Sequence, residues 1–115
     1  MTDKKFKLPK EQFKQLIEEG MGACIASDKI TVDGLLVGYM YREEPQIDVD
    51  SGWRFFSGTE DQEYVDNPDN LMYYDLNTIA NYDPAIIPYL HLETGTELER
   101  NEDNTFKYII DENSL

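Results

Sequence analysis

The apolar residues near the start of the chain recur at helical spacing. Phe13, Leu16 and Ile17 would lie on one face of a helix. Pro9 suits the first turn of such a helix, and Gly20 is typical of the residue that follows the last turn. The pattern therefore predicts an N-terminal helix between Pro9 and Gly20 whose apolar face packs on the rest of the protein.

Beyond residue 20 the apolar residues come in short runs separated by turn residues, which is typical of strands. Gly38, inside the first long run, indicates a bulge or a close approach of another backbone segment. Asp33-Gly34 before that run and residues 101–104 near the end of the chain predict two hairpins. Strands are expected at residues 35–42, 53–57, 97–100 and 105–110, with 71–74 as a further strand and 23–26 as a strand or a core connection.

Short helices are also expected. Thr59 is a good N-cap, and the acidic residues behind it suit the positive end of a helix over residues 60–66. Asp83-Pro84 gives the same start signal, but Pro88 limits the following segment to a single turn or a kinked piece. Together these elements predict a single α+β domain over residues 1–115, with a mostly antiparallel sheet, an N-terminal helix and short additional helices.

The formal charge of the 115-residue chain is −14, and it is unevenly distributed. Residues 1–14 carry a net charge of +3, so the remaining residues carry −17. Between Ile30 and Phe106 there are 17 acidic residues and three basic ones. Such a field repels nucleic acids and anionic membranes and attracts basic proteins. We therefore expect a basic protein as partner and neither nucleic acid nor membrane, with solubility alone as the alternative explanation of the charge.

The sequence favours a cytoplasmic location. No apolar run approaches the roughly 20 residues needed to cross a bilayer. The charged N-terminus lacks the apolar core of a secretory signal. The single cysteine, Cys24, can form no internal disulfide and lies in an apolar run, which indicates a buried structural thiol in a reducing compartment.

The residues that catalysis or metal binding would need are scarce. His91 is the only histidine, and neither a nucleophile turn nor a glycine-rich phosphate loop is recognisable. One cysteine and one histidine do not make a zinc site, and residues 48–52 depart from a calcium loop in the position of the glycine. We expect no catalytic residue, no cofactor and no metal. The enzymatic alternative is a small hydrolase that uses His91 with Asp83 or Glu93.

Three arginines lie in or beside apolar strands and are interpreted as structural clamps: Arg42, Arg54 and Arg100. The planar guanidinium of arginine suits bidentate, partly buried pairing with carboxylates. We expect each arginine to pair with a carboxylate and to tie an acidic loop to the sheet. Binding of an anion is disfavoured, because the surrounding field is negative.

Three stretches resemble the signature of one bacterial family. They read YMYREEP at residues 39–45, DSGWRFFSGTED at residues 50–61 and YDLNTIANYDP at residues 74–84. The family is catalogued as domain of unknown function number 2185 and also as immunity protein family thirty-three of polymorphic toxin systems. The resemblance covers about residues 25–100 and departs from the family pattern in the loop that begins at His91. It implies an α+β fold and a toxin as partner, and it supplies no catalytic residues.

The resemblance also suggests a use for the aromatic and acidic run at residues 50–64. Aromatic residues and arginine dominate interface hot spots, and an acidic rim speeds the capture of a basic partner. The candidate partner-binding residues are Trp53, Glu60, Asp61, Glu63 and Tyr64. For Trp53 a place in the core is equally open, and the acidic residues also fit a capped helix start.

An immunity protein with this surface is expected to cover a basic catalytic cleft, and a nuclease toxin is one natural target because its cleft must attract phosphates. The alternative is a cytoplasmic binding module that has no toxin partner. The sequence does not separate these two functions, because both need an acidic surface that carries aromatic residues.

Overall fold

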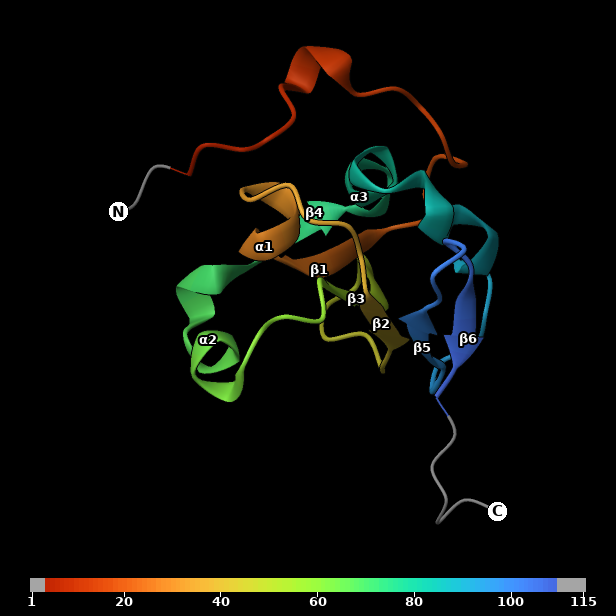
Figure 1. Ribbon diagram of the computed structural model, residues 1–115. Helices are drawn as coiled ribbons and strands as arrows, with labels where there is room; N and C mark the ends of the chain where they lie inside the picture. The colour runs from red at the N-terminus through yellow and green to blue at the C-terminus, as the bar shows by residue number, and fades with distance from the viewer. Residues whose placement is uncertain (1–3, 110–115) are drawn as a thin grey trace.

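The computed structural model describes residues 4–109, and a six-stranded sheet organises them (Figure 1). The strand order is β4-β1-β3-β2-β5-β6. β1 and β3 run parallel, and all other neighbouring pairs are antiparallel. The predicted α+β fold with a mostly antiparallel sheet is therefore confirmed. The strands are β1 (Ala23–Ser27), β2 (Tyr39–Arg42), β3 (Asp50–Phe56), β4 (Leu71–Asp75), β5 (Glu97–Arg100) and β6 (Phe106–Tyr108).

The helices are short. They are α1 (Asp28–Thr31), α2 (Gln62–Asp66) and α3 (Leu76–Tyr82), with 3₁₀ turns η1 (Lys10–Gln12), η2 (Pro68–Asn70) and η3 (Pro84–Tyr89). The predicted helix at residues 60–66 is α2, but its N-cap is Asp61 instead of Thr59, because the Asp61 carboxylate accepts a hydrogen bond from the Tyr64 amide at 2.8 Å. Asp83 caps η3 by accepting from the Ala85 amide, as its position before Pro84 indicates.

One face of the sheet forms the core. α1, α3 and η3 supply Ile30, Leu76, Ile79, Ile86 and Leu90 to this core, and the N-terminal segment lies outside α3 (Figure 1). The alternation of side chains along each strand selects which sheet residues point into it. These residues are Cys24 and Ala26 of β1, Met40 of β2, Trp53 and Phe55 of β3, Leu98 of β5 and Phe106 of β6.

The predicted N-terminal helix is wrong, because only η1 is helical in this region. The segment crosses α3 in an extended form that we call the strap, residues 4–22. Asn77 accepts hydrogen bonds from the Leu16 and Ile17 amides at 2.8 and 3.2 Å. Asn81, one turn later, accepts from the Lys14 amide at 3.0 Å, and both asparagines donate to the Lys14 carbonyl. Side chains of α3 therefore supply the hydrogen bonds of strap backbone groups at Lys14, Leu16 and Ile17 that a helix would otherwise have to supply.

The predicted hairpin at Asp33-Gly34 is also wrong. Residues 28–31 instead form α1, and β1 pairs with β3 and β4 instead of β2. The hairpin at residues 101–104 joins β5 and β6 as predicted. The last predicted strand extended to residue 110, but β6 ends at Tyr108 and residue 110 lies outside the described part of the chain.

Gly38 marks a close approach of two backbone segments, as expected from its place in an apolar run. A Cβ atom at this position would collide with the Ser57 carbonyl oxygen. Gly38 also donates its amide to the Phe56 carbonyl at 2.9 Å. The glycine therefore lets the chain enter β2 directly against the end of β3.

Replacing Asn77 with alanine should destabilise the protein and release the strap. The substitution removes three hydrogen bonds to strap backbone groups, so we expect a loss of about 1–3 kcal/mol in the free energy of unfolding. Chemical denaturation measures this loss. Amide hydrogen exchange of Leu16 and Ile17 should also become faster in the variant.

The matched control is Thr78→Ala on the same helix, since the Thr78 hydroxyl takes part in none of the hydrogen bonds found among residues 4–109. It should change stability by much less. Equal losses in the two variants, or unchanged exchange of Leu16 in Asn77→Ala, would contradict the role given to Asn77.

Candidate functional site

The second face of the sheet carries a band of aromatic side chains. Tyr41 of β2 lies opposite Arg54 of β3, which in turn neighbours Ile25 of β1. Tyr73 of β4 lies opposite Ile25 on the other side. Directly paired residues share a face of the sheet, so these four side chains form one row across β2, β3, β1 and β4, on the side away from the core.

A second row runs beside it. Tyr39 of β2 pairs with Phe56 of β3, and the rings of Tyr39, Tyr41 and Phe56 lie with centroids 5.6–6.1 Å apart. The Tyr41 and Phe56 rings are almost parallel, at 6°. We call the surface formed by Tyr39, Tyr41, Phe56 and Tyr73 the aromatic face.

α2 lies on this side of the sheet, opposite α3 (Figure 1). Its Val65 separates two shallow hollows. One hollow, of about 250 Å³, is lined by Val65, Glu60 and the rings of Tyr39, Tyr41 and Phe56. The other, of about 300 Å³, is lined by Val65 together with Ile25, Asp66, Pro68, Leu71, Met72 and Tyr73. The aromatic face is therefore a grooved surface with one helix across it.

Carboxylates border the aromatic face. On β5, Glu97 lies opposite Tyr41 and Glu99 opposite Tyr39, and both glutamates are exposed. Burial together with the neighbouring Glu97 carboxylate raises the pKa of Tyr39 to about 12, so its phenol stays neutral at ordinary pH. Negative charge and neutral aromatic rings thus meet on one surface.

Trp53 is the residue for which core and interface were both open, and it lies in the core. Its side chain is 0% exposed, stacks beside Phe55, and donates its indole N–H to the Leu90 carbonyl at 3.1 Å. A buried tryptophan satisfied in this way holds η3 against the sheet. The indole is therefore inaccessible to a partner of the folded protein.

The other four candidate residues lie at or near α2. Glu60 accepts the Ser57 and Gly58 amides at 2.9 Å each, so it fixes the turn that leads into α2. Burial would raise its pKa, but hydrogen bonding from Ser27 and Ser57 outweighs burial and the pKa is lowered. Asp61 is the N-cap of α2. Both carboxylates thus have structural duties in addition to any contact with a partner.

Glu63 and Tyr64 differ from this pair. Glu63 is exposed, and its carboxylate forms none of the hydrogen bonds or ion pairs found among residues 4–109. Tyr64 is half-buried, with the Lys29 ammonium 5.2 Å from its ring centroid. The candidate residues are therefore neighbours in space, but only Glu63 is a carboxylate without a local structural role.

Tyr39, Tyr41, Phe56 and Tyr73 were not among the candidate partner-binding residues. The signal was present as Tyr39-x-Tyr41, because residues two apart in a strand share a face. The corresponding position of β3, Phe56, points away from the core that Phe55 enters.

Arg54 is buried beneath the aromatic face. It donates to Asp50 through both terminal nitrogens, at 2.9 and 2.7 Å, and to Glu43 through Nε at 2.5 Å. Its side chain is only 2% exposed. Asp50 also accepts the Gln46 and Gly52 amides, so the pair ties the loop between β2 and β3 to the sheet.

The other two arginines have different partners. Arg100 pairs with the buried Asp83 at 2.6 Å and lies 5.4 Å from the Phe106 ring centroid. Arg42 donates to the carbonyls of Ser51 and Leu92, at 2.9 and 2.7 Å. The expectation that Arg42 pairs with a carboxylate is wrong, because its guanidinium is directed at backbone oxygens beside the Trp53 ring.

The candidate base of a hydrolase is poorly placed. His91 is exposed in the turn after η3, and its imidazole takes part in no hydrogen bond found among residues 4–109. Cys24 is fully buried, and this burial raises the pKa of its thiol, which disfavours the reactive thiolate. Among the residues that the structure describes, no cluster of three potential metal ligands occurs, and no helix is long and apolar enough to cross a bilayer.

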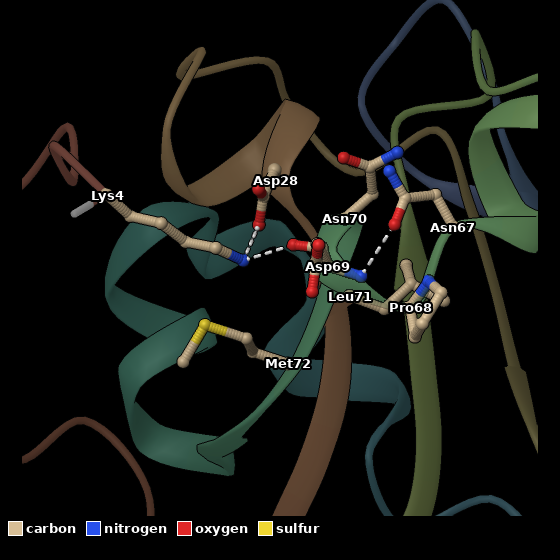
Figure 2. A pocket seen from close by; sticks show the side chains of 8 residues that line it. All are labelled: Lys4, Asp28, Asn67, Pro68, Asp69, Asn70, Leu71 and Met72. Atoms are coloured by element: carbon tan, nitrogen blue, oxygen red, sulfur yellow. Dashed lines mark hydrogen bonds and ion pairs between the residues drawn. The ribbon is translucent and has the colours of Figure 1, made fainter. Parts of the chain in front are cut away.

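A polar hollow of about 650 Å³ lies beside η2, at the β4 edge of the sheet (Figure 2). The Lys4 ammonium enters it from the strap and donates to the Asp28 carboxylate at 2.8 Å and to the Asp69 carbonyl at 2.6 Å. Asn67 and Asn70 line the opposite wall. The lysine joins the strap to α1 and η2, and its charge is already compensated.

Comparison with known proteins gives one finding. The family model of the immunity protein Imm33 domain matches residues 24–110 of this chain. The match contains the aromatic face, α2 and all three arginines, and it leaves out the strap. No curated protein and no solved structure matches the chain.

The Asp50–Arg54 pair should make stability depend on pH in acid. Hydrogen bonding from Arg54 lowers the pKa of Asp50 from 3.8 to about 2 in the folded protein. Because folding lowers the pKa of Asp50, its ionised carboxylate stabilises the folded protein at pH values above the pKa of the unfolded state. This stabilisation is lost as the pH falls from about 4 through 2. It amounts to about 2 kcal/mol.

Asp50→Asn should therefore be much less stable than the wild type at pH 5, and the difference should shrink toward pH 2. Denaturant unfolding at several pH values measures it. Asp48→Asn, an exposed residue of the same loop, is the matched control and should show little difference at either pH. A gap between wild type and Asp50→Asn that stays constant from pH 5 to 2 would contradict the assignment.

Proposed function

The chain belongs to the immunity protein Imm33 domain family, and from this premise we propose that it neutralises a cognate bacterial toxin by binding it through the aromatic face and its acidic border. The toxin is proposed to be a basic protein whose catalytic cleft is covered in the complex. The protein acts as a stoichiometric inhibitor, and no catalytic step of its own is involved. The cytoplasm of the toxin-producing cell is the proposed place of action.

The observation that carries this proposal is the aromatic face itself. Three aromatic rings and an aliphatic helix residue line a hollow on a sheet surface, and carboxylates stand on its border. Aromatic side chains supply contact area at low entropic cost and are frequent in hot spots. A border of uniform charge favours one kind of partner and disfavours others.

The net charge supports a basic partner over a second copy of the chain. Two copies that meet through their aromatic faces would bring Glu97 and Glu99 of each copy together, in molecules of formal charge −14. Like charges facing each other across an interface are unfavourable. A toxin with a basic cleft, such as a nuclease, has the complementary field, because its cleft must attract phosphate groups.

The alternative is a binding module that has no toxin partner. The gene neighbourhood separates the two functions, because the gene of an immunity protein is expected beside the gene of the toxin that the protein neutralises. A toxin-domain gene directly upstream supports the proposal. Co-expression in a sensitive host then tests it: the chain should restore growth in the presence of that toxin, and failure to bind or protect would overturn the proposed function.

Removing charge at the border of the aromatic face should slow association with the toxin. The test variant combines Glu63→Gln, Glu97→Gln and Glu99→Gln, because none of these side chains holds a loop or a helix end in place. We expect association to be slower by about tenfold at low salt and its salt dependence to be flatter, since steering falls with the Debye length. Stopped-flow measurements at several salt concentrations determine both quantities.

The matched control combines Glu11→Gln, Glu18→Gln and Glu19→Gln on the strap, which lies on the other side of the sheet (Figure 1). It changes the net charge by the same amount. If both variants slow association equally, only the net charge matters and the aromatic face is not the contact surface. Glu60 and Asp61 are left unchanged, because their loss would disturb the start of α2.

A further inference from the structure

The hollow between α2 and β2 has aromatic walls and a carboxylate, but no cation. Its lining consists of Tyr39, Tyr41, Phe56, Val65 and Glu60. The Glu60 carboxylate accepts the Ser57 and Gly58 amides at 2.9 Å, one on each oxygen, and is also hydrogen-bonded by Ser27. Because a carboxylate offers about four acceptor positions, it can still accept from a ligand. Arg54, which lies on the same face opposite Tyr41, is buried and already paired with Asp50 and Glu43.

Elsewhere the chain completes such arrangements with its own cations. Arg100 combines an ion pair with Asp83 and a position over the Phe106 ring, at 2.6 and 5.4 Å. Lys29 lies over the Tyr64 ring at 5.2 Å. An aromatic ring beside a carboxylate attracts a cation through both the ring quadrupole and the ion pair. In the hollow, both of these elements are present, and its lining among the described residues contains no cation.

We propose that this hollow is a subsite for an arginine side chain of the bound protein partner. The guanidinium enters beside Val65, lies against the rings of Tyr41 and Phe56, and donates to the Glu60 carboxylate. The subsite rests on the proposed function, since it gives the basic toxin a specific contact at the centre of the aromatic face. It also gives Glu60 a second role beyond the turn that it fixes.

The geometry favours arginine over lysine. A guanidinium is planar, so it can stack on an aromatic ring while its edge donates hydrogen bonds. It is also less strongly hydrated than an ammonium group, which makes its entry into a half-buried hollow less costly. Preference for arginine therefore separates a shaped subsite from general attraction by an acidic protein.

The test uses two blocked peptides, Gly-Gly-Arg-Gly-Gly and Gly-Gly-Lys-Gly-Gly, titrated into the intact chain and followed by NMR. The expected result is saturable shifts of the Tyr39, Tyr41 and Phe56 ring protons. We expect the arginine peptide to bind about threefold or more tightly than the lysine peptide, because only the planar guanidinium can stack on a ring while its edge donates to Glu60; the size is that of one exposed cation–π contact. The δ-methylene protons of the bound arginine should move upfield in the ring currents, an effect that needs no variant.

Two pairs of variants sharpen the test. Tyr41→Leu should abolish the preference for arginine, while Tyr41→Phe should retain it because the ring remains. Tyr108→Leu, at an exposed tyrosine of β6, is the matched control and should leave the titration unchanged. Three results would each overturn the subsite. The two peptides could bind with equal affinity, the shifts could spread over the acidic surface without saturation at the rings, or the titration of Tyr41→Leu could equal that of the wild type.

The peptide experiment needs no toxin, so its outcome is separate from that of the proposed function. Binding of the arginine peptide without protection against any toxin would leave the subsite in place and remove the immunity role. Protection against a toxin without any arginine preference would retain the immunity role and remove the subsite.

Discussion

A buried guanidinium in β3 sets the geometry on which the aromatic face depends. Arg54 lies in a strand with neighbours on both sides, and burial of its charge is tolerable only because Asp50 and Glu43 accept its hydrogen bonds. Asp50 in turn holds the Gln46 and Gly52 amides. The loop between β2 and β3 is thereby fixed, and the two strands that carry Tyr39, Tyr41 and Phe56 are held in register.

The two faces of the sheet divide the aromatic residues between the core and the proposed binding surface. On β3, alternation sends Trp53 and Phe55 into the core and leaves Phe56 on the other side. Short helices and the strap cover the core face, whereas α2 is the one helix of the described residues that lies on the aromatic face (Figure 1). A small protein can in this way keep an apolar binding surface and still bury a sufficient core.

Much of the fold could be predicted from local pattern. The alternation and turn residues around β3 and β5 indicated strands, and the acidic residues before Tyr64 indicated α2. The strap could not be predicted, because its spacing of apolar residues fits a helix and its actual partners, Asn77 and Asn81, lie more than 60 positions away. The parallel pairing of β1 with β3 is likewise a long-range choice that no local signal reveals.

The sequence named Trp53 and residues 60–64 as the partner-binding surface, and that assignment stays a prediction. An acidic, aromatic surface near residues 60–64 was expected, and α2 does lie there beside aromatic rings. The rings are those of Tyr39, Tyr41 and Phe56, since the indole of Trp53 is required for the contact with Leu90. Which of two aromatic neighbours in a strand faces outward depends on what covers the sheet, and this is a tertiary property.

Binding of a toxin on the aromatic face can be tested by hydrogen exchange of the whole chain, with and without a saturating amount of the cognate toxin. If the toxin binds there, exchange should become slower in residues 57–66 and in β2, with the strap and α3 unchanged. Slower exchange confined to the strap and α3 would contradict it and would place the contact on the opposite side of the sheet.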